Sequence, residues 1–425
     1  MTGFTMTEKI LGARAGGAPV RAGTIATVKP DVVLLNDVSG PLAFDQFRAM
    51  GATRPAEPDG VVLVADHFAP AKDVLAAEAI GTMRRFAGEH AIKHFYEPGR
   101  GGIEHTLLVE LGLVGHGSVV FGGDSHTCTA GAFNAIGMGF GSTDLAAAMA
   151  AGKLWIRIPE SIKVFVTGRP GPFVAGKDVI LDVIRRIGSD GAADAALEFV
   201  GPGLDWLSTD ARMAAANMAV EAGADTCVFA GDGLSEAGTA ANGAPLRPPI
   251  QADADAAYRS IIEIDLAALS PIVACPPSPA SGVPVETLRG RHIDQVYVGN
   301  CSNGTLTDLR QVAEVLRGRR IAPHVRMIVV PATQKIWRQA LAEGLLDVIA
   351  EAGAAVSVPT CGACFGGHMG VLGAGETAIA TVNRNFRGRM GHPDSLVYLS
   401  NAWVAAAAAV AGKVVPPQEI VGDMQ

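Results

Sequence analysis

Three cysteines constrain this chain more than any other feature of its sequence. Cys361 and Cys364 are separated by two residues, a spacing that lets two thiolates reach one metal centre. Cys301 lies far upstream, so only the fold can bring it to them. Each of these segments follows an apolar run and is rich in Gly, Ser, Thr and Asn, which is typical of loops at the carboxyl ends of strands in α/β proteins.

The number of cysteines narrows the kind of site. A structural zinc ion normally takes four protein ligands, and a disulfide would leave one cysteine over. A [4Fe–4S] cluster normally takes four thiolates. When three thiolates hold it, one iron is free to bind a hydroxyl or a carboxylate. From these residues alone, a redox-active cysteine pair or a set of buried thiols remains an alternative.

Length and composition exclude several classes of protein. The chain has 425 residues, enough for two or three domains. Its net charge of −8, without a dense run of Lys and Arg, argues against nucleic acid as a partner. Six cysteines over this length favour a reducing compartment rather than a disulfide framework. The N-terminus has no apolar signal segment, and the most apolar tract, residues 402–411, is too short to span a membrane. We therefore expect a soluble, cytoplasmic protein without a membrane partner.

Strand and helix patterns alternate along the chain and predict an α/β fold with mostly parallel sheets. Val61–Phe68 is too continuously apolar for a half-exposed strand, so we expect a buried parallel strand with Asp66 and His67 at its carboxyl end. A second strand, residues 118–121, runs into a Gly-Gly-Asp-Ser-His loop. Residues 130–154 are dense in Gly and Ala and predict a closely packed helical region.

Three domains are expected. An alternating strand pattern begins at Ile162, and a segment rich in Pro and Ser, residues 276–284, reads as a linker. The predicted boundaries place an α/β domain with the His and Asp motifs at residues 1–161 and a middle α/β domain at 162–285. An α/β domain with the cysteines and an arginine-rich run occupies residues 286–425.

Six motifs in a fixed order resemble those of the aconitase superfamily, over residues 7 to about 420. They are Asp66-His67, Gly102-Ile-Glu-His105, Gly123-Asp-Ser-His-Thr127, Gly299-Asn-Cys-Ser-Asn-Gly304, Cys361-Gly-Ala-Cys364 and Asn383-Arg-Asn-Phe-Arg-Gly-Arg389. The similarity is greatest to the large subunits of dehydratases that act on branched hydroxy-diacids. It implies an aconitase-like fold, with three α/β domains of mostly parallel sheets around a central cluster site and without the superfamily's swivel domain.

The resemblance also implies the site residues. Cys301, Cys361 and Cys364 match the ligands of one [4Fe–4S] cluster per chain, with one open iron. The matching catalytic residues are Asp66, His67, His105, Asp124 and His126. The matching substrate-binding residues are Asp37, Ser125, Asn383, Arg384 and Arg389.

The residue types suit a dehydration on independent grounds. A carboxylate beside an imidazole fixes its tautomer and keeps it protonated, so that it can donate a proton to a departing hydroxyl. Arg384 and Arg389 can each form paired hydrogen bonds with a substrate carboxylate. Alone, Asp66-His67 would more often be an ordinary strand-end pair, and the other motifs favour the catalytic interpretation.

The superfamily completes its site with a swivel domain whose Gly-Ser-Ser-Arg-type loop carries a serine base, and this sequence shows no such loop. We therefore expect a small swivel-domain subunit as partner and a composite active site. The expected activity is that of a hydro-lyase, with 3-isopropylmalate in leucine biosynthesis as the first expected substrate. Homocitrate or homoisocitrate, 2-methylmalate and 2,3-dimethylmalate are alternatives. A non-catalytic iron or redox sensor and a zinc-binding structural protein are alternatives of other classes.

Several positions depart from the superfamily pattern without removing a cluster ligand or a substrate arginine. Asn300 and Ser302 flank Cys301 where Ser and Thr are common. Glu104 replaces a small or apolar residue, and Asn401-Ala-Trp403 replaces a Ser-Pro-Ala-like turn. We expect Glu104 or Trp403 to reshape the substrate pocket. Arg387 is expected to face solvent, and Cys128, Cys227 and Cys275 to be buried thiols.

Overall fold

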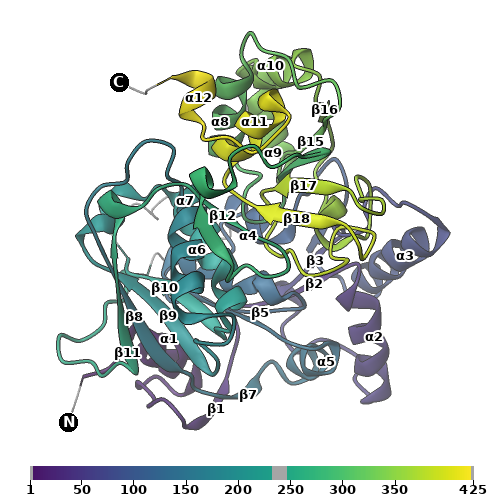
Figure 1. Cartoon of the computed structure of the whole chain (residues 1–425). Coiled ribbons are helices and arrows are strands. Elements are labelled where there is room, and N and C mark those ends of the chain that lie inside the picture. Colours follow the sequence, from purple (N-terminus) through teal and green to yellow (C-terminus); the bar gives the residue numbers. More distant parts are fainter. Residues whose placement is uncertain (1–2, 232–246, 423–425) are drawn as a thin grey trace.

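Three sheets organise the molecule and occupy separate parts of it (Figure 1). The computed structural model describes residues 3–231 and 247–422 of the chain. The first sheet has the strand order β4-β3-β2-β5-β6, and all of its pairings are parallel. Its strands are β2 (Val32–Asn36), β3 (Val61–Val64), β4 (His94–Tyr96), β5 (Val119–Gly122) and β6 (Ile136–Gly139).

Helices cover both faces of this sheet, which is why every residue of β2 and β3 is buried and all of them except Asn36 are apolar. Three helices lie beside it: α2 (Ser39–Ala49), α3 (Val74–Glu89) and α5 (Ser142–Ala151). The short helix α4 (Glu104–Glu110) and the 3₁₀ helix η2 (Ser125–Phe133) carry site motifs. Asp66 and His67 follow β3 at its carboxyl end, as the sequence predicts.

The middle sheet has the order β10-β9-β8-β11 and is also parallel. Two helices accompany it, α6 (Gly176–Ile187) and α7 (Thr209–Asn217), and α7 packs against η2 of the first region. This contact brings the middle sheet's helices to the site. The strands are β8 (Glu160–Thr167), β9 (Ala195–Val200), β10 (Thr226–Phe229) and β11 (Ser260–Asp265).

The last sheet has the order β13-β12-β18-β17-β14-β15-β16. Its central strands are parallel, whereas β12 runs antiparallel to β18 and to β13. The strands are β12 (Ile272–Ala274), β13 (Gly282–Pro284), β14 (Gln295–Gly299), β15 (Arg326–Val330), β16 (Ala355–Val356), β17 (Thr377–Ala380) and β18 (Leu396–Leu399). The helices of this region are α8 (Leu306–Leu316), α9 (Gln334–Ala342), α10 (Leu345–Glu351), α11 (Ala402–Ala411) and α12 (Gln418–Val421).

The remaining elements are an N-terminal helix and a small ribbon. Helix α1 (Met6–Ala15) begins with a capping box in which Thr5 and Glu8 satisfy each other's backbone N–H groups. Strands β1 (Ile25–Val28) and β7 (Leu154–Arg157) pair antiparallel. None of the helices described is both long and apolar enough to cross a membrane.

Two details differ from the sequence-based expectations. The hairpin of β12 and β13 falls within the predicted middle domain, yet it extends the last sheet. The helical region predicted for residues 130–154 is wrong in part, because it contains strand β6 between η2 and α5. Small residues are needed there for close packing: a Cβ atom added at Gly137 would lie 1.9 Å from the Thr127 carbonyl oxygen. The predicted domain boundaries otherwise stay a prediction.

The packing between η2 and β10 predicts a sharp effect of one methyl group. A Cβ atom at Gly131 would lie 1.9 Å from the carbonyl oxygen of Cys227. We expect Gly131→Ala to lower the free energy of unfolding by about 1–3 kcal/mol, because backbone atoms must move apart. Urea denaturation measures this loss. Gly171→Ala is the matched control, since no atom lies within 4 Å of its added Cβ. Equal stability of the two variants would contradict this packing.

Candidate active site

One cavity collects most of the predicted site residues. It lies where the carboxyl ends of strands in the first and last sheets meet. Ile103, which was not predicted as a site residue, and Glu104, which was expected only to reshape the pocket, also line it. The predicted residues that line it are Asp66, His67, His105, Asp124, His126, Cys301, Cys361, Cys364, Asn383 and Arg389. Asp37, Ser125 and Arg384 are not among the lining residues.

The three cysteines are buried and free of disulfide bonds. Asn383 lies between two of them: its Nδ2 donates to Cys301 Sγ at 3.4 Å, and its Oδ1 accepts from Cys364 Sγ at 3.4 Å. Cys361 and Cys364 are within hydrogen-bond reach of each other. Three thiols facing one cavity, with an amide among them, suit the ligand set of an iron–sulfur cluster.

Asn300 shapes the loop that carries Cys301. Its backbone has φ 120°, which is unusual for a residue with a side chain. Its Oδ1 accepts hydrogen bonds from the backbone N–H groups of Ser302 and Asn303, each at 3.0 Å. Its Nδ2 lies 3.8 Å from Cys364 Sγ. The Asn that departs from the superfamily pattern therefore closes the loop on itself and contacts a second cysteine.

Two carboxylates hold His67. Its Nδ1 lies 2.7 Å from Asp66 Oδ1, and its Nε2 lies 3.6 Å from Asp124 Oδ2. Burial alone would lower the pKa of His67, but these carboxylates favour the charged ring and raise the pKa well above its ordinary value. Both carboxylates therefore favour the protonated form of the His67 ring over the neutral form.

Asp124 is the common acceptor of the site. It accepts from the backbone N–H of His126 at 2.7 Å and contacts His105 Nε2 at 2.9 Å. Burial would raise the pKa of Asp124, but hydrogen bonds from His105, His126 and His67 hold it well below its usual range. Three imidazoles thus share one ionised carboxylate.

His126 also reaches Glu221, whose Oε1 lies 2.9 Å from His126 Nε2. Despite burial, Asp124 and Glu221 raise the pKa of His126.

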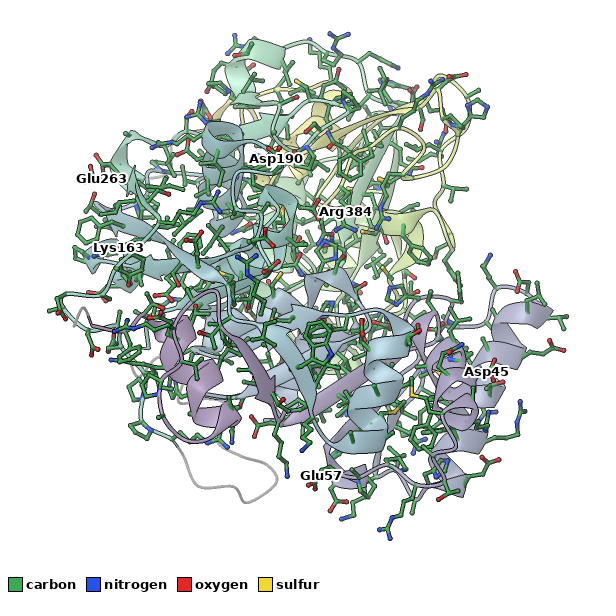
Figure 2. All side chains as sticks on the ribbon, turned by 90° about the horizontal axis from the view of Figure 1, so that it is seen from below. Asp45, Glu57, Lys163, Asp190, Glu263 and Arg384 are labelled. Carbon is green, nitrogen blue, oxygen red and sulfur yellow. The ribbon has the colours of Figure 1, made fainter. Side chains whose placement is uncertain are left out.

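Glu221 Oε1 accepts from Arg384 Nε at 2.6 Å, and Arg384 Nη2 donates to Ser125 Oγ at 3.0 Å. In Figure 2 Arg384 lies near the middle of the view, whereas Asp45, Glu57, Lys163 and Glu263 lie toward its outline.

The other predicted substrate-binding residues lie in different settings. Arg389 lines the cavity, and its Nε is buried with no hydrogen-bond partner among the residues described. Asp37 accepts from three backbone N–H groups, those of Asp66, His67 and Phe68, at 2.7–3.0 Å. These contacts are those of a residue that positions the Asp66–His67 segment. A contact between Asp37 and substrate stays a prediction.

Sequence reasoning missed Asn217 and Glu221 on the middle region. Asn217 donates to Thr129 Oγ1 at 2.8 Å and accepts from Asn383 Nδ2. A signal was available, because these two polar residues stand four apart, one helical turn, in an otherwise alanine-rich stretch.

Of the two residues expected to reshape the pocket, Glu104 lines it and Trp403 does not. Glu104 is fully buried and accepts from Asn36 Nδ2 at 2.9 Å, and its Oε2 has no partner within the described part of the chain. Burial and the nearby charges of Asp66 and Asp124 raise the pKa of Glu104 well above its usual range. The expectation for Trp403 is wrong, because it packs edge-on against Phe173 in the core of the last region.

Most of the expectations for residues outside the cavity are confirmed. Cys128 and Cys227 are buried thiols, and the Arg387 side chain is exposed and pairs with Asp394 at 2.9 Å. Cys275 is only half-buried, because it lies near the β12–β13 hairpin at the edge of the last sheet.

Comparison with known proteins identifies the family. The aconitase family model (aconitate hydratase) matches residues 8–412. This chain belongs to the aconitase family. It is a hydro-lyase family whose members use a [4Fe–4S] cluster.

Two full-length relatives are named as large subunits of 3-isopropylmalate dehydratase. The chain is 53% identical over 419 residues to a protein of Rubrobacter xylanophilus named 3-isopropylmalate dehydratase large subunit 2, covering 99% of both chains. It is 48% identical over 418 residues to the 3-isopropylmalate dehydratase large subunit of Acetivibrio thermocellus, covering 98% of this chain and 100% of the other.

A solved structure supports the fold. Thermococcus kodakaraensis aconitase X in its holo form superimposes with a TM-score of 0.51 at 12% identity, covering 90% of each chain. The aconitase-like α/β fold expected from the sequence is confirmed.

The ligand assignment predicts different outcomes for two cysteines. We expect Cys361→Ser to lose most of its iron and acid-labile sulfide after anaerobic reconstitution, because one of three thiolates is removed from the cavity. Cys275→Ser should retain the wild-type content, since Cys275 lies outside the cavity. Metal and sulfide analysis per chain measures both. Equal losses in the two variants would contradict the assignment.

Proposed function

We propose that this chain is the cluster-bearing large subunit of a 3-isopropylmalate dehydratase. The enzyme would interconvert 3-isopropylmalate and 2-isopropylmalate through their dehydrated intermediate in leucine biosynthesis. The observation that carries the proposal is the cavity that joins three cysteines to a His–Asp network and to the half-buried Arg389. Relatives of that name at about half identity over the full chain support the choice of substrate.

Cys301, Cys361 and Cys364 would hold the [4Fe–4S] cluster. When bound, the cluster supplies a Lewis acid at an iron without a protein ligand. The unpartnered Arg389 Nε and the polar Asn383 fit a cavity that receives both a cluster and an anionic substrate. A reducing, cytoplasmic location is part of the proposal, because such a cluster is sensitive to oxygen.

The chain's own residues then perform two tasks. His67, kept protonated between Asp66 and Asp124, is placed to donate a proton to the departing hydroxyl. Arg389 offers a guanidinium to a substrate carboxylate, and Arg384 lies beside the cavity behind Ser125. Glu104, whose pKa is raised by burial and by the charges of Asp66 and Asp124, forms part of the cavity wall.

A small partner subunit would complete the site. The cavity-lining residues include no serine, tyrosine or lysine, and the ionised Asp124 is already occupied by three imidazoles. We assign the base that removes the carbon-bound proton to the partner. Two exposed apolar side chains, Val38 and Phe386, stand next to predicted site residues in the sequence and are available for contact with a partner.

The substrate assignment is tested by a panel. The anaerobically reconstituted chain, mixed with its small subunit, is assayed for hydration of unsaturated diacids with isopropyl, methyl, dimethyl and carboxyethyl substituents. We expect the highest kcat/KM with the isopropyl compound. A higher kcat/KM with another substituent would leave the hydro-lyase reaction in place. The substrate would then be one of the homocitrate, 2-methylmalate or dimethylmalate type. Absence of turnover with an intact cluster would favour the non-catalytic sensor.

The role of His67 predicts a pH effect. The raised pKa means that the ring keeps its proton to a higher pH, so activity that needs this proton falls only as pH rises through the raised value. Asp66→Asn removes one of the carboxylates that raise it. We therefore expect the alkaline limb of the kcat/KM profile to move to lower pH by about one unit or more.

A matched control separates this effect from a general loss of charge. Asp45→Asn removes an exposed carboxylate on α2 and should leave the profile unchanged. An unchanged alkaline limb in Asp66→Asn would rule out His67 as the titrating acid.

A further inference from the structure

A fully buried lysine reaches the cysteine loop from the middle region. Lys177 is the second residue of α6, and its side chain is 0% exposed. Its Nζ donates three hydrogen bonds: to the Thr381 carbonyl oxygen at 2.7 Å, to Asn303 Oδ1 at 2.9 Å and to Ser302 Oγ at 3.2 Å. Two of these acceptors directly follow Cys301 in the chain.

This position is costly for an ammonium group. Burial removes it from water, and the first turn of a helix disfavours a positive charge. No carboxylate lies within 4 Å of Nζ among the residues described. Burial lowers the pKa of Lys177 to about 8, against the opposing charges of Asp308, Cys364 and Cys301. Asp308 is the negative group that acts most strongly on this ammonium, and Cys364 and Cys301 follow it.

A hydrogen-bonded chain orients the contact. Asp308 stands at the start of α8, where its carboxylate accepts from the backbone N–H of Thr305 at 3.0 Å and from Asn303 Nδ2 at 3.1 Å. With Nδ2 fixed by Asp308, the Oδ1 of Asn303 is turned toward Lys177. Hydrogen bonds therefore hold the Cys301 loop to α8 through Asp308 and to α6 through Lys177.

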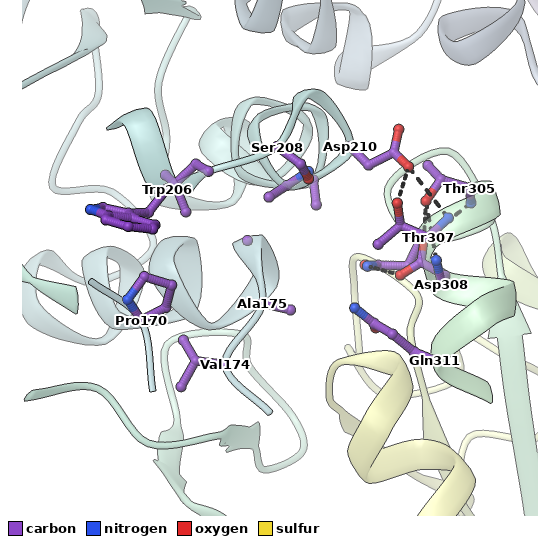
Figure 3. Close-up of a pocket in the computed structure, with 15 residues that line it drawn as sticks. Pro170, Val174, Ala175, Trp206, Ser208, Asp210, Thr305, Thr307, Asp308 and Gln311 are labelled. Atoms are coloured by element: carbon purple, nitrogen blue, oxygen red, sulfur yellow. Dashed lines mark hydrogen bonds between the residues drawn. The ribbon is translucent and has the colours of Figure 1, made fainter. Parts of the chain in front are cut away.

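The cavity in Figure 3 does not supply an alternative partner for Lys177. It has a volume of about 140 Å³ and lies between the beginnings of α6, α7 and α8, where Asp210 binds Thr307 at 2.6 Å. Asn303 and Asp308 line it, but Lys177 does not. The ammonium therefore faces the cysteine loop, with the capping residues of α8 between it and this cavity.

We infer that Lys177 is a positioning residue for the iron–sulfur cluster: it tethers the Cys301 loop to α6 and provides the positive charge that offsets the cluster thiolates. This inference rests on the proposed function, since it requires the cluster. The proposed effect of Lys177 on the cluster is electrostatic, because in a water-excluded site one fixed charge acts strongly on its neighbours. A nearby positive charge also makes the addition of an electron to the cluster easier.

Two variants separate the tether from the charge. Lys177→Gln keeps an N–H donor and removes the charge, whereas Lys177→Met removes both. Lys153→Met, at an exposed lysine, is the control. Each chain is reconstituted anaerobically, and three quantities are measured: iron and sulfide content, the reduction potential of the cluster, and the rate of cluster bleaching in air. Circular dichroism of the metal-free chains reports folding.

We expect a lower reduction potential in both Lys177 variants and at least about fivefold faster bleaching, with Lys153→Met at wild-type values. A potential unchanged in Lys177→Gln would overturn the charge role. Metal-free variants that are unfolded would overturn the inference as well, because Lys177 would then serve the fold itself. A wild-type chain that takes up no cluster would instead refute the proposed function on which the inference rests.

Discussion

A backbone hydrogen bond joins the C-x-x-C loop to the Asp66–His67 loop across the candidate site. The N–H of Cys361, after the last sheet's β16, donates to the carbonyl oxygen of Asp66, after the first sheet's β3, at 2.8 Å. The hydroxyl of Thr360 donates to the same oxygen at 3.2 Å. The cysteine loop and the Asp66–His67 loop therefore share one edge, and the cavity between them depends on how the two sheets meet. Loops at the carboxyl ends of parallel strands make such a meeting possible.

Charged side chains pair with one another at the edge where the cysteine loop and the Asp66–His67 loop meet. Asp124 contacts three imidazoles, and Glu221 contacts His126 and Arg384, so that these two carboxylates face groups that can carry positive charge. Such a network is costly to assemble and rigid once assembled, which suits groups that must hold protons at fixed atoms. Contributions come from all three regions of the chain, since Glu221 belongs to the middle region. The site is therefore a property of the whole fold.

The sequence predicted what local pattern encodes. The buried strand before Asp66 and His67 followed from its apolar run. The convergence of Cys301 with the C-x-x-C pair was implied by the resemblance to the aconitase superfamily. The sequence did not predict contacts between segments that lie far apart in the chain. Glu221 and Lys177 meet the site only because α6 and the 3₁₀ helix η4 (Met218–Ala222) pack against other regions, and nothing in their neighbouring residues specifies that packing. Trp403 was misplaced for the same reason, because its burial depends on Phe173.

The central claim is that three cysteines hold a cluster with one iron left open to substrate. Mössbauer spectroscopy of the chain reconstituted with ⁵⁷Fe, recorded with and without 3-isopropylmalate in the presence of the small subunit, tests it most directly. This account predicts that the signal of one iron site changes on substrate addition while the others stay constant. Four sites that all remain unchanged, with substrate bound, would contradict it.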